Sequence, residues 1–106
     1  MKLNYCLDGK VMTEIDVDMK EQTVQIKNHT DVLLDRAFGI NEHPTYEDFL
    51  AFCEDRGIPQ SRFGFQSEMR LRGIKDTSPL GVMLFYNGRI SDDEFYVELV
   101  EDDYDR

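Results

Sequence analysis

The chain has 106 residues, 41% of them apolar and 11% aromatic, which is enough for the core of one domain and too little chain for two. No apolar run approaches the roughly 20 residues that span a bilayer, and the N-terminus lacks the apolar stretch of a signal peptide, so we expect one cytoplasmic domain over residues 1–106. The 22 acidic and 12 basic residues give a net charge of −10, which disfavours direct contact with nucleic acid or membranes and favours basic partners.

Residues 1–28 are predicted to form an antiparallel β-meander. Apolar and polar residues alternate over 3–7, 11–18 and 23–27, as in strands with one buried face. Asp8-Gly9 separates the first two strands and favours a type I′ hairpin turn. We assign the buried face of the second strand to Val11, Thr13, Ile15 and Val17, so its other face carries Met12, Glu14, Asp16 and Asp18.

The predicted helical part covers residues 45–86. A first helix follows Thr45, a favourable N-cap with Asp48 in the capping-box position, and ends at Gly57. Its apolar stripe consists of Tyr46, Phe49, Leu50 and Cys53. Before this helix, Val32 to Leu34 forms either a short strand or a buried turn, and residues 39–44 form a loop.

Two further helices and a strand complete the prediction. The second helix covers about 60–72, with Ser61 near its start and Gly73 after its end, and the third runs from Ser78-Pro79 to about Tyr86. Residues 94–100 alternate as a last strand, and the acidic tail 101–106 is expected to fray. The fold class is therefore α+β, a small antiparallel sheet with helices on one face and the C-terminal strand as a candidate to join it.

The sequence offers little support for catalysis, so we expect a protein that is not an enzyme. Cys53 lies on an apolar stripe, Cys6 is expected to be half-exposed on a strand, and His29 and His43 lie in predicted loops, so no cysteine–histidine pair is indicated. No glycine-rich phosphate loop and no metal-ligand spacing are present, and we expect neither a cofactor nor a metal.

The acidic side chains are the main functional candidates. On the second strand, alternate carboxylates are spaced by about 6.5–7 Å, close to the separation of successive phosphates on an extended nucleic-acid strand. Such a row can imitate nucleic acid and bind a basic channel, although any solvated strand face alternates in the same way. The candidate partner-binding residues are Glu14, Asp16, Asp18, Glu47, Asp48, Glu54, Asp55, Asp92, Asp93 and Glu94.

A cluster of basic residues, here called the basic island, is the main observation against a nucleic-acid mimic. Its members flank the first two predicted helices and the turn between them: Arg56, Arg62, Arg70, Arg72, Lys75 and Arg89. Two helices joined by Gly57 to Gln60 resemble a helix-turn-helix, in which Arg62 and Gln66 would read bases. The net charge of −10 opposes DNA binding, so pairing of these arginines with nearby acids is the favoured interpretation.

The segment PTYEDFLAFCEDRGIPQSR, residues 44–62, resembles small bacterial proteins of mobile elements. They share a Pro-Thr-x-Glu-x-Phe helix start and an Arg-x-x-Pro-x-x-Arg turn, here Pro44, Thr45, Glu47, Phe49, Arg56, Pro59 and Arg62. The resemblance continues through Gly73, Asp76, Pro79, Gly88 and Asp93 to Phe95-Tyr96. This chain departs from the group at Gly57, where a cysteine or an aliphatic residue is common. No common activity attaches to the group, so the resemblance implies a genomic setting and carries over no catalytic residue.

That setting favours an inhibitor. Mobile elements encode small acidic proteins that block host nucleases, including anti-CRISPR and anti-restriction proteins. We therefore expect a non-enzymatic protein that inhibits or modulates a nucleic-acid-handling enzyme by binding its basic surface. The alternative is a regulatory or antitoxin-like partner of another mobile-element protein, docking through aromatic residues that have no assigned core position: Phe38, Phe63, Phe65, Tyr86 and Tyr104.

Overall fold

The computed structural model describes residues 1–102 and confirms the α+β class. Its strands are β1 (Lys2–Leu7), β2 (Lys10–Asp18), β3 (Thr23–Asn28) and β4 (Tyr96–Glu101). Its helices are the short 3₁₀ turn η1 (Leu33–Asp35), α1 (Tyr46–Asp55), α2 (Phe65–Leu71) and α3 (Pro79–Phe85). Most of the predicted acidic tail, residues 103–106, lies outside the described residues.

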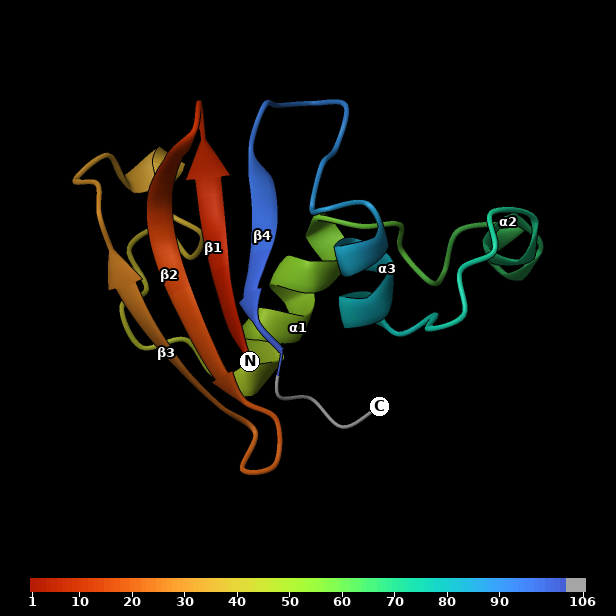
Figure 1. Ribbon diagram of the computed structural model, residues 1–106, viewed down its shortest axis with the longest axis horizontal. Coiled ribbons are helices and arrows are strands. Elements are labelled where there is room, and N and C mark those ends of the chain that lie inside the picture. The colour runs from red at the N-terminus through yellow and green to blue at the C-terminus, as the bar shows by residue number, and fades with distance from the viewer. Residues whose placement is uncertain (103–106) are drawn as a thin grey trace.

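The four strands form one antiparallel sheet in the order β3-β2-β1-β4, so the C-terminal strand does join the meander (Figure 1). Asp8 and Gly9 both have positive φ, 52° and 77°, as a type I′ turn requires. β4 begins at Tyr96 rather than at 94, because the Asp93 carboxylate accepts from the Phe95 amide in a tight turn before the strand. The resulting sheet has β1 and β2 in its interior and β3 and β4 at its edges.

The core lies between the sheet and α1, with α3 beside α1 (Figure 1). Phe49 and Cys53 of α1 are fully buried against Leu3 and Ile15 of the sheet, as the predicted stripe requires. Phe52 is also buried although it lies outside that stripe, and its ring packs edge-on against Tyr5. The helices therefore cover one face of the sheet and leave the other face open.

Local signals place the starts of α1 and α3 as predicted. The Thr45 hydroxyl accepts from the Asp48 amide and the Asp48 carboxylate accepts from the Thr45 amide, which completes a capping box. Ser78 caps α3 through the Gly81 amide, and Pro79 stands at its first turn. After α3, Gly88 has φ of +64° and lies against Val97, where a Cβ would come within 2.5 Å of Val97 Cγ2.

The second helix is shorter than predicted. α2 begins at Phe65 after Gly64, which has a left-handed φ of 76°, so the predicted start near Ser61 is wrong. Residues 56–64 instead form turns that carry α2 away from the sheet (Figure 1). Phe65 and Met69 pack with Ile74 and Val82 in a second, smaller apolar cluster.

Two local predictions before α1 are corrected. Val32 to Leu34 is neither a strand nor buried, because it enters the single turn η1 and 92% of Leu34 is exposed. Cys6 is buried and not half-exposed, because Tyr96 of β4 pairs with it and the side chains of Tyr96 and Glu98 lie against its thiol. Within residues 1–102, none of the helices combines the length and apolar character needed to cross a bilayer.

Candidate functional site

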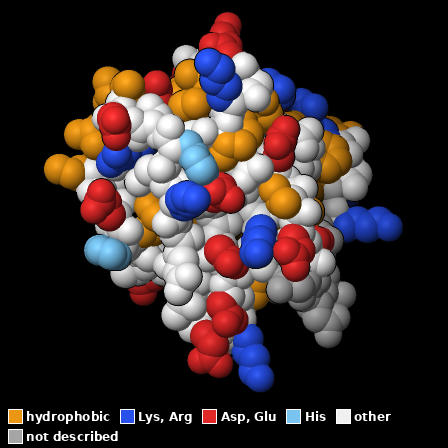
Figure 2. Space-filling view, turned by 60° about the vertical axis from the view of Figure 1, so that its left-hand side comes forward, with side chains coloured by type: hydrophobic (Ala, Val, Ile, Leu, Met, Phe, Trp, Pro, Cys, Tyr) orange, Lys and Arg blue, Asp and Glu red, His pale blue; other side chains and the backbone are white. Residues whose placement is uncertain are grey.

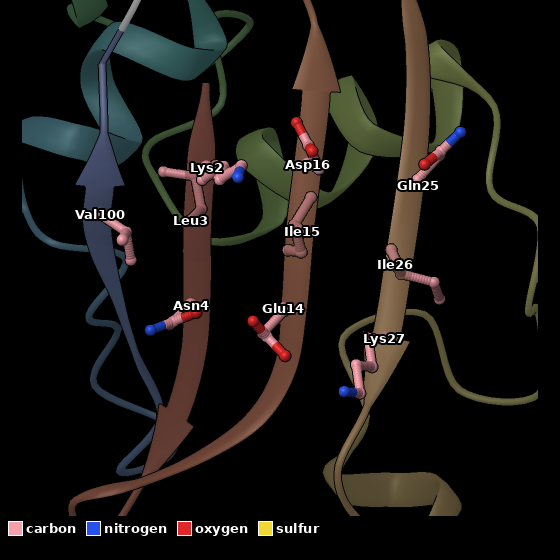
Figure 3. Close-up of a pocket in the computed structure, with 10 residues that line it drawn as sticks. All are labelled: Lys2, Leu3, Asn4, Glu14, Ile15, Asp16, Gln25, Ile26, Lys27 and Val100. Carbon is pink, nitrogen blue, oxygen red and sulfur yellow. The ribbon is translucent and has the colours of Figure 1, made fainter.

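The open face of the sheet carries the acidic row predicted on the second strand. Ile15 and Val17 point into the core, so alternation leaves Glu14, Asp16 and Asp18 exposed on the face away from the helices. The surface is slightly hollowed there, with a volume of about 250 Å³. Figure 3 shows the side chains that line this hollow on three of the strands and at Val100 of β4. We call this surface the open acidic face.

Strand pairing sets cations beside these carboxylates. Lys27 of β3 stands opposite Glu14, and Lys2 of β1 stands opposite Asp16 (Figure 3). His29 Nε2 donates to Glu14 Oε2 at 2.5 Å, and this hydrogen bond lowers the pKa of Glu14. The position of these cations is not predictable from periodicity, because only the strand register determines which residue faces a given acid.

β4 adds a further carboxylate to the open acidic face. Glu98 stands opposite Asn4 of β1, in line with Glu14 on the far side of that strand. In the described part of the chain, carboxylates therefore outnumber lysines on this face. The face therefore has a net negative charge, but lysines stand between its carboxylates.

Two of the remaining candidate acids lie in the first turn of α1. Asp48 is committed to the capping box, and it also accepts from Asn41 Nδ2 at 3.2 Å. The hydrogen bonds from Thr45 lower the pKa of Asp48. Glu47 is exposed beside it, where a negative charge is favourable at a helix N-terminus. Asp48 thus has a structural task, and Glu47 is an exposed charge of the helical layer, away from the open acidic face.

The last group of candidate acids surrounds an ion pair that the sequence analysis did not predict. Arg56, at the end of α1, exposes only 7% of its side chain and donates to both carboxylate oxygens of Asp93, at 2.8 and 2.9 Å. It also donates to the carbonyl oxygens of Gly88 and Phe95, both at 2.9 Å. These contacts, here called the Arg56–Asp93 anchor, fix α1 to the segment between α3 and β4. Hydrogen bonds from Arg56 lower the pKa of Asp93.

The anchor changes how the surrounding acids are interpreted. Glu54 and Asp55 precede Arg56, and Asp92 and Glu94 flank Asp93, so the anchor gathers these exposed carboxylates at one end of α1. They lie on the helical layer and not on the open acidic face. The ten predicted residues thus occupy three separate places. Figure 2 likewise shows acidic side chains interspersed with basic and apolar ones on the face in view.

The nucleophilic side chains lie in the interior. Cys6 and Cys53 are both buried free thiols, and burial raises the pKa of Cys53 to about 12. Burial also raises the pKa of Cys6. Neither thiol is therefore activated as a nucleophile at neutral pH. Within residues 1–102, no group of three histidine, cysteine or acidic side chains is arranged to hold a metal ion.

The predicted aromatic surface is dispersed by folding. Phe38 packs against Phe52 at the main core, and Phe65 is buried in the second cluster. Phe63 is fully exposed, Tyr86 is half-buried, and Tyr104 lies outside the described residues.

The helix-turn-helix geometry is also absent from this part of the chain. α1 and α2 are separated by residues 56–64, and Arg62 lies in that connection, where its Nη1 is 3.9 Å from Glu68 Oε2. Gln66 is exposed on the two-turn helix α2, so the two predicted base-reading residues do not share one recognition helix.

No protein-family model, curated protein or solved structure matches the chain. The resemblance of residues 44–62 to mobile-element proteins therefore stays a prediction.

Proposed function

We propose that this protein is a non-enzymatic inhibitor or modulator of a nucleic-acid-handling enzyme, and that it binds the enzyme's basic surface through the open acidic face. The observation that carries the proposal is that Glu14, Asp16 and Asp18 project from one uncovered strand. Their spacing along β2 suits a row of lysines or arginines that otherwise contacts successive phosphates.

The lysines on the open acidic face refine the expected mode of binding. Lys27 stands opposite Glu14, and Lys2 stands opposite Asp16 with its Nζ 3.7 Å from Glu101 Oε2 of β4, so both lysines offset part of the negative charge of this face. A partner is then recognised by a defined pattern of charges and not by bulk acidity alone. Complementary patterns of this kind speed association and exclude wrong partners more than they add affinity.

The proposal is tested by affinity capture from a nuclease-treated bacterial lysate, with elution by a salt gradient. The sheet-face variant is Glu14→Lys, Asp16→Lys and Asp18→Lys. A charge-matched variant, Glu47→Lys, Glu54→Lys and Asp92→Lys, carries the same change on the helical layer. The captured protein is identified, and its binding to nucleic acid is then measured with and without each form of this protein.

We expect the wild-type and the helical-layer variant to capture a nucleic-acid-binding enzyme that elutes at moderate salt, and to compete with its nucleic acid. The sheet-face variant should do neither. If both variants lose capture equally, binding depends on net charge and not on the open acidic face. Capture that survives both salt and the sheet-face variant would contradict the proposal and favour an apolar interface.

A further inference from the structure

A groove between α2 and the turn that follows α3 brings together three arginines of this acidic chain. Arg62, Arg72 and Arg89 line it, with Glu68 between the first two in space, and its volume is about 370 Å³. The other lining residues are Gly57, Ile58, Tyr86, Ile90 and Ser91. We call this feature the arginine groove.

The arginine groove has a surplus of positive charge. One carboxylate, Glu68, serves two guanidinium groups: its oxygens lie 3.4 Å from Arg72 Nε and 3.9 Å from Arg62 Nη1. Both arginine side chains are more than half exposed, so these pairs are weak and easily rearranged. Arg89 has no carboxylate within ion-pair distance in residues 1–102, and its guanidinium lies 4.6 Å from the Tyr96 ring centroid.

The walls of the arginine groove also include groups suited to a ligand. The Arg72 guanidinium lies over the half-buried ring of Tyr86, 5.9 Å from its centroid. The Tyr86 hydroxyl oxygen lies below this surface, where it is buried and has no hydrogen-bond partner among the described residues, so the ring and not the hydroxyl forms the wall. Ile58 and Ile90 supply apolar surface. A few polar groups on a partly apolar concave surface are typical of small-molecule sites.

We propose that the arginine groove binds the phosphate group of a small phosphate monoester. Three guanidinium groups and one carboxylate leave two positive charges, and a phosphate monoester carries about −1.5 to −2 at neutral pH. The planar arginine fork also donates two parallel hydrogen bonds to phosphate oxygens. A long nucleic acid is disfavoured, because it would bring many phosphates into the field of a chain with net charge −10. This site is independent of the open acidic face.

The test is titration of the full chain, labelled with ¹⁵N, followed by NMR of its amides. Inorganic phosphate and adenosine 5′-monophosphate are the probes, and adenosine is the phosphate-free control. Arg72→Ala and Arg89→Ala remove groove charges on two different segments. Arg70→Ala is the matched control, since Arg70 is an exposed arginine of α2 that does not line the groove. Thermal unfolding of each variant verifies that it is folded.

We expect both phosphates, and not adenosine, to shift the amides of Gly57, Glu68 and Ser91 saturably. Arg72→Ala and Arg89→Ala should each weaken binding about tenfold, and Arg70→Ala less than about twofold. If the nucleotide binds more tightly than inorganic phosphate, the natural ligand is a phosphate monoester. If the two bind equally, the ligand is free phosphate.

Three results would overturn the proposal: no saturable shift at millimolar phosphate, equal weakening by Arg70→Ala, or tighter binding of a short single-stranded oligonucleotide with shifts that extend beyond the groove. The first two results do not bear on the open acidic face, so such a failure is distinguishable from failure of the proposed function. Oligonucleotide binding by this chain would count against both proposals.

Discussion

The Arg56–Asp93 anchor and the open acidic face use the same chemical group in opposite ways. At the anchor, Asp93 accepts two hydrogen bonds from Arg56, whose side chain is only 7% exposed. On the open face, Asp16 stands in solvent across from Lys2. Water screens the second arrangement more than the first, because Arg56 is buried although 32% of the Asp93 side chain is exposed, so equal charges contribute unequally to stability. Two aspartates that look alike in the sequence therefore contribute differently to the stability of the fold.

The largest effect is expected from Arg56→Ala. This change leaves Asp93 without its partner and the carbonyl oxygens of Gly88 and Phe95 without a donor. We expect the free energy of unfolding to fall by about 4 kcal/mol, because the buried Arg56 side chain leaves a cavity and two backbone carbonyl oxygens lose their donor. Urea denaturation measures it, with Arg62→Ala as an exposed control expected to cost less than about 1 kcal/mol. Similar losses for both arginines would mean that burial does not distinguish them.

The turn beside the anchor should respond strongly to Gly88→Ala. The backbone φ of +64° is unfavourable for alanine, and the new Cβ would come within 2.5 Å of Val97 Cγ2. We expect a loss of about 3 kcal/mol in thermal or urea unfolding. Gly9→Ala is the matched control, since Gly9 also has positive φ but nothing lies within 4 Å of its added Cβ, and about 1 kcal/mol is expected.

A smaller effect, dependent on pH, is expected from Asp93→Asn. Because Arg56 lowers the pKa of Asp93 in the folded state, the ionised carboxylate stabilises the fold above its unfolded pKa of about 3.9. That stability is lost as the pH falls through the folded pKa. We expect the variant to lose about 2 kcal/mol at pH 7 and to show a flatter decline below about pH 5. If the variant loses stability below pH 5 as steeply as the wild type does, other carboxylates such as Asp48 cause that loss.

The smallest effect on stability is expected on the open acidic face. Glu14→Gln, Asp16→Asn and Asp18→Asn together should change the free energy of unfolding by less than about 1 kcal/mol, because these side chains are exposed. The same variant should weaken capture of the proposed partner. A stability loss comparable to that of Arg56→Ala would show that this face has a structural task and would remove the contrast between the two regions.

Much of the local structure was predictable because its signals are short-range. Asp8-Gly9 determines a hairpin through its backbone preferences, and Thr45 with Asp48 determines where α1 begins. The start of α2 was mispredicted because Gly64, which lies inside the predicted range 60–72, is instead the left-handed N-cap of the helix. Cys6 was misplaced because Tyr96 and Glu98 of β4, which are distant in the sequence, lie against its thiol and cover it.

By itself, the sequence determined the α+β class, the meander, and the exposure of Glu14, Asp16 and Asp18, since strand alternation needs only neighbouring residues. Only the tertiary structure decided which acids are free and which are committed. Arg56 and Asp93 are 37 residues apart, and their pairing depends on how α1 meets the segment before β4. Likewise, strand register placed Lys2 and Lys27 beside the acidic row. Contacts between distant segments follow from packing, which periodicity along the chain does not encode.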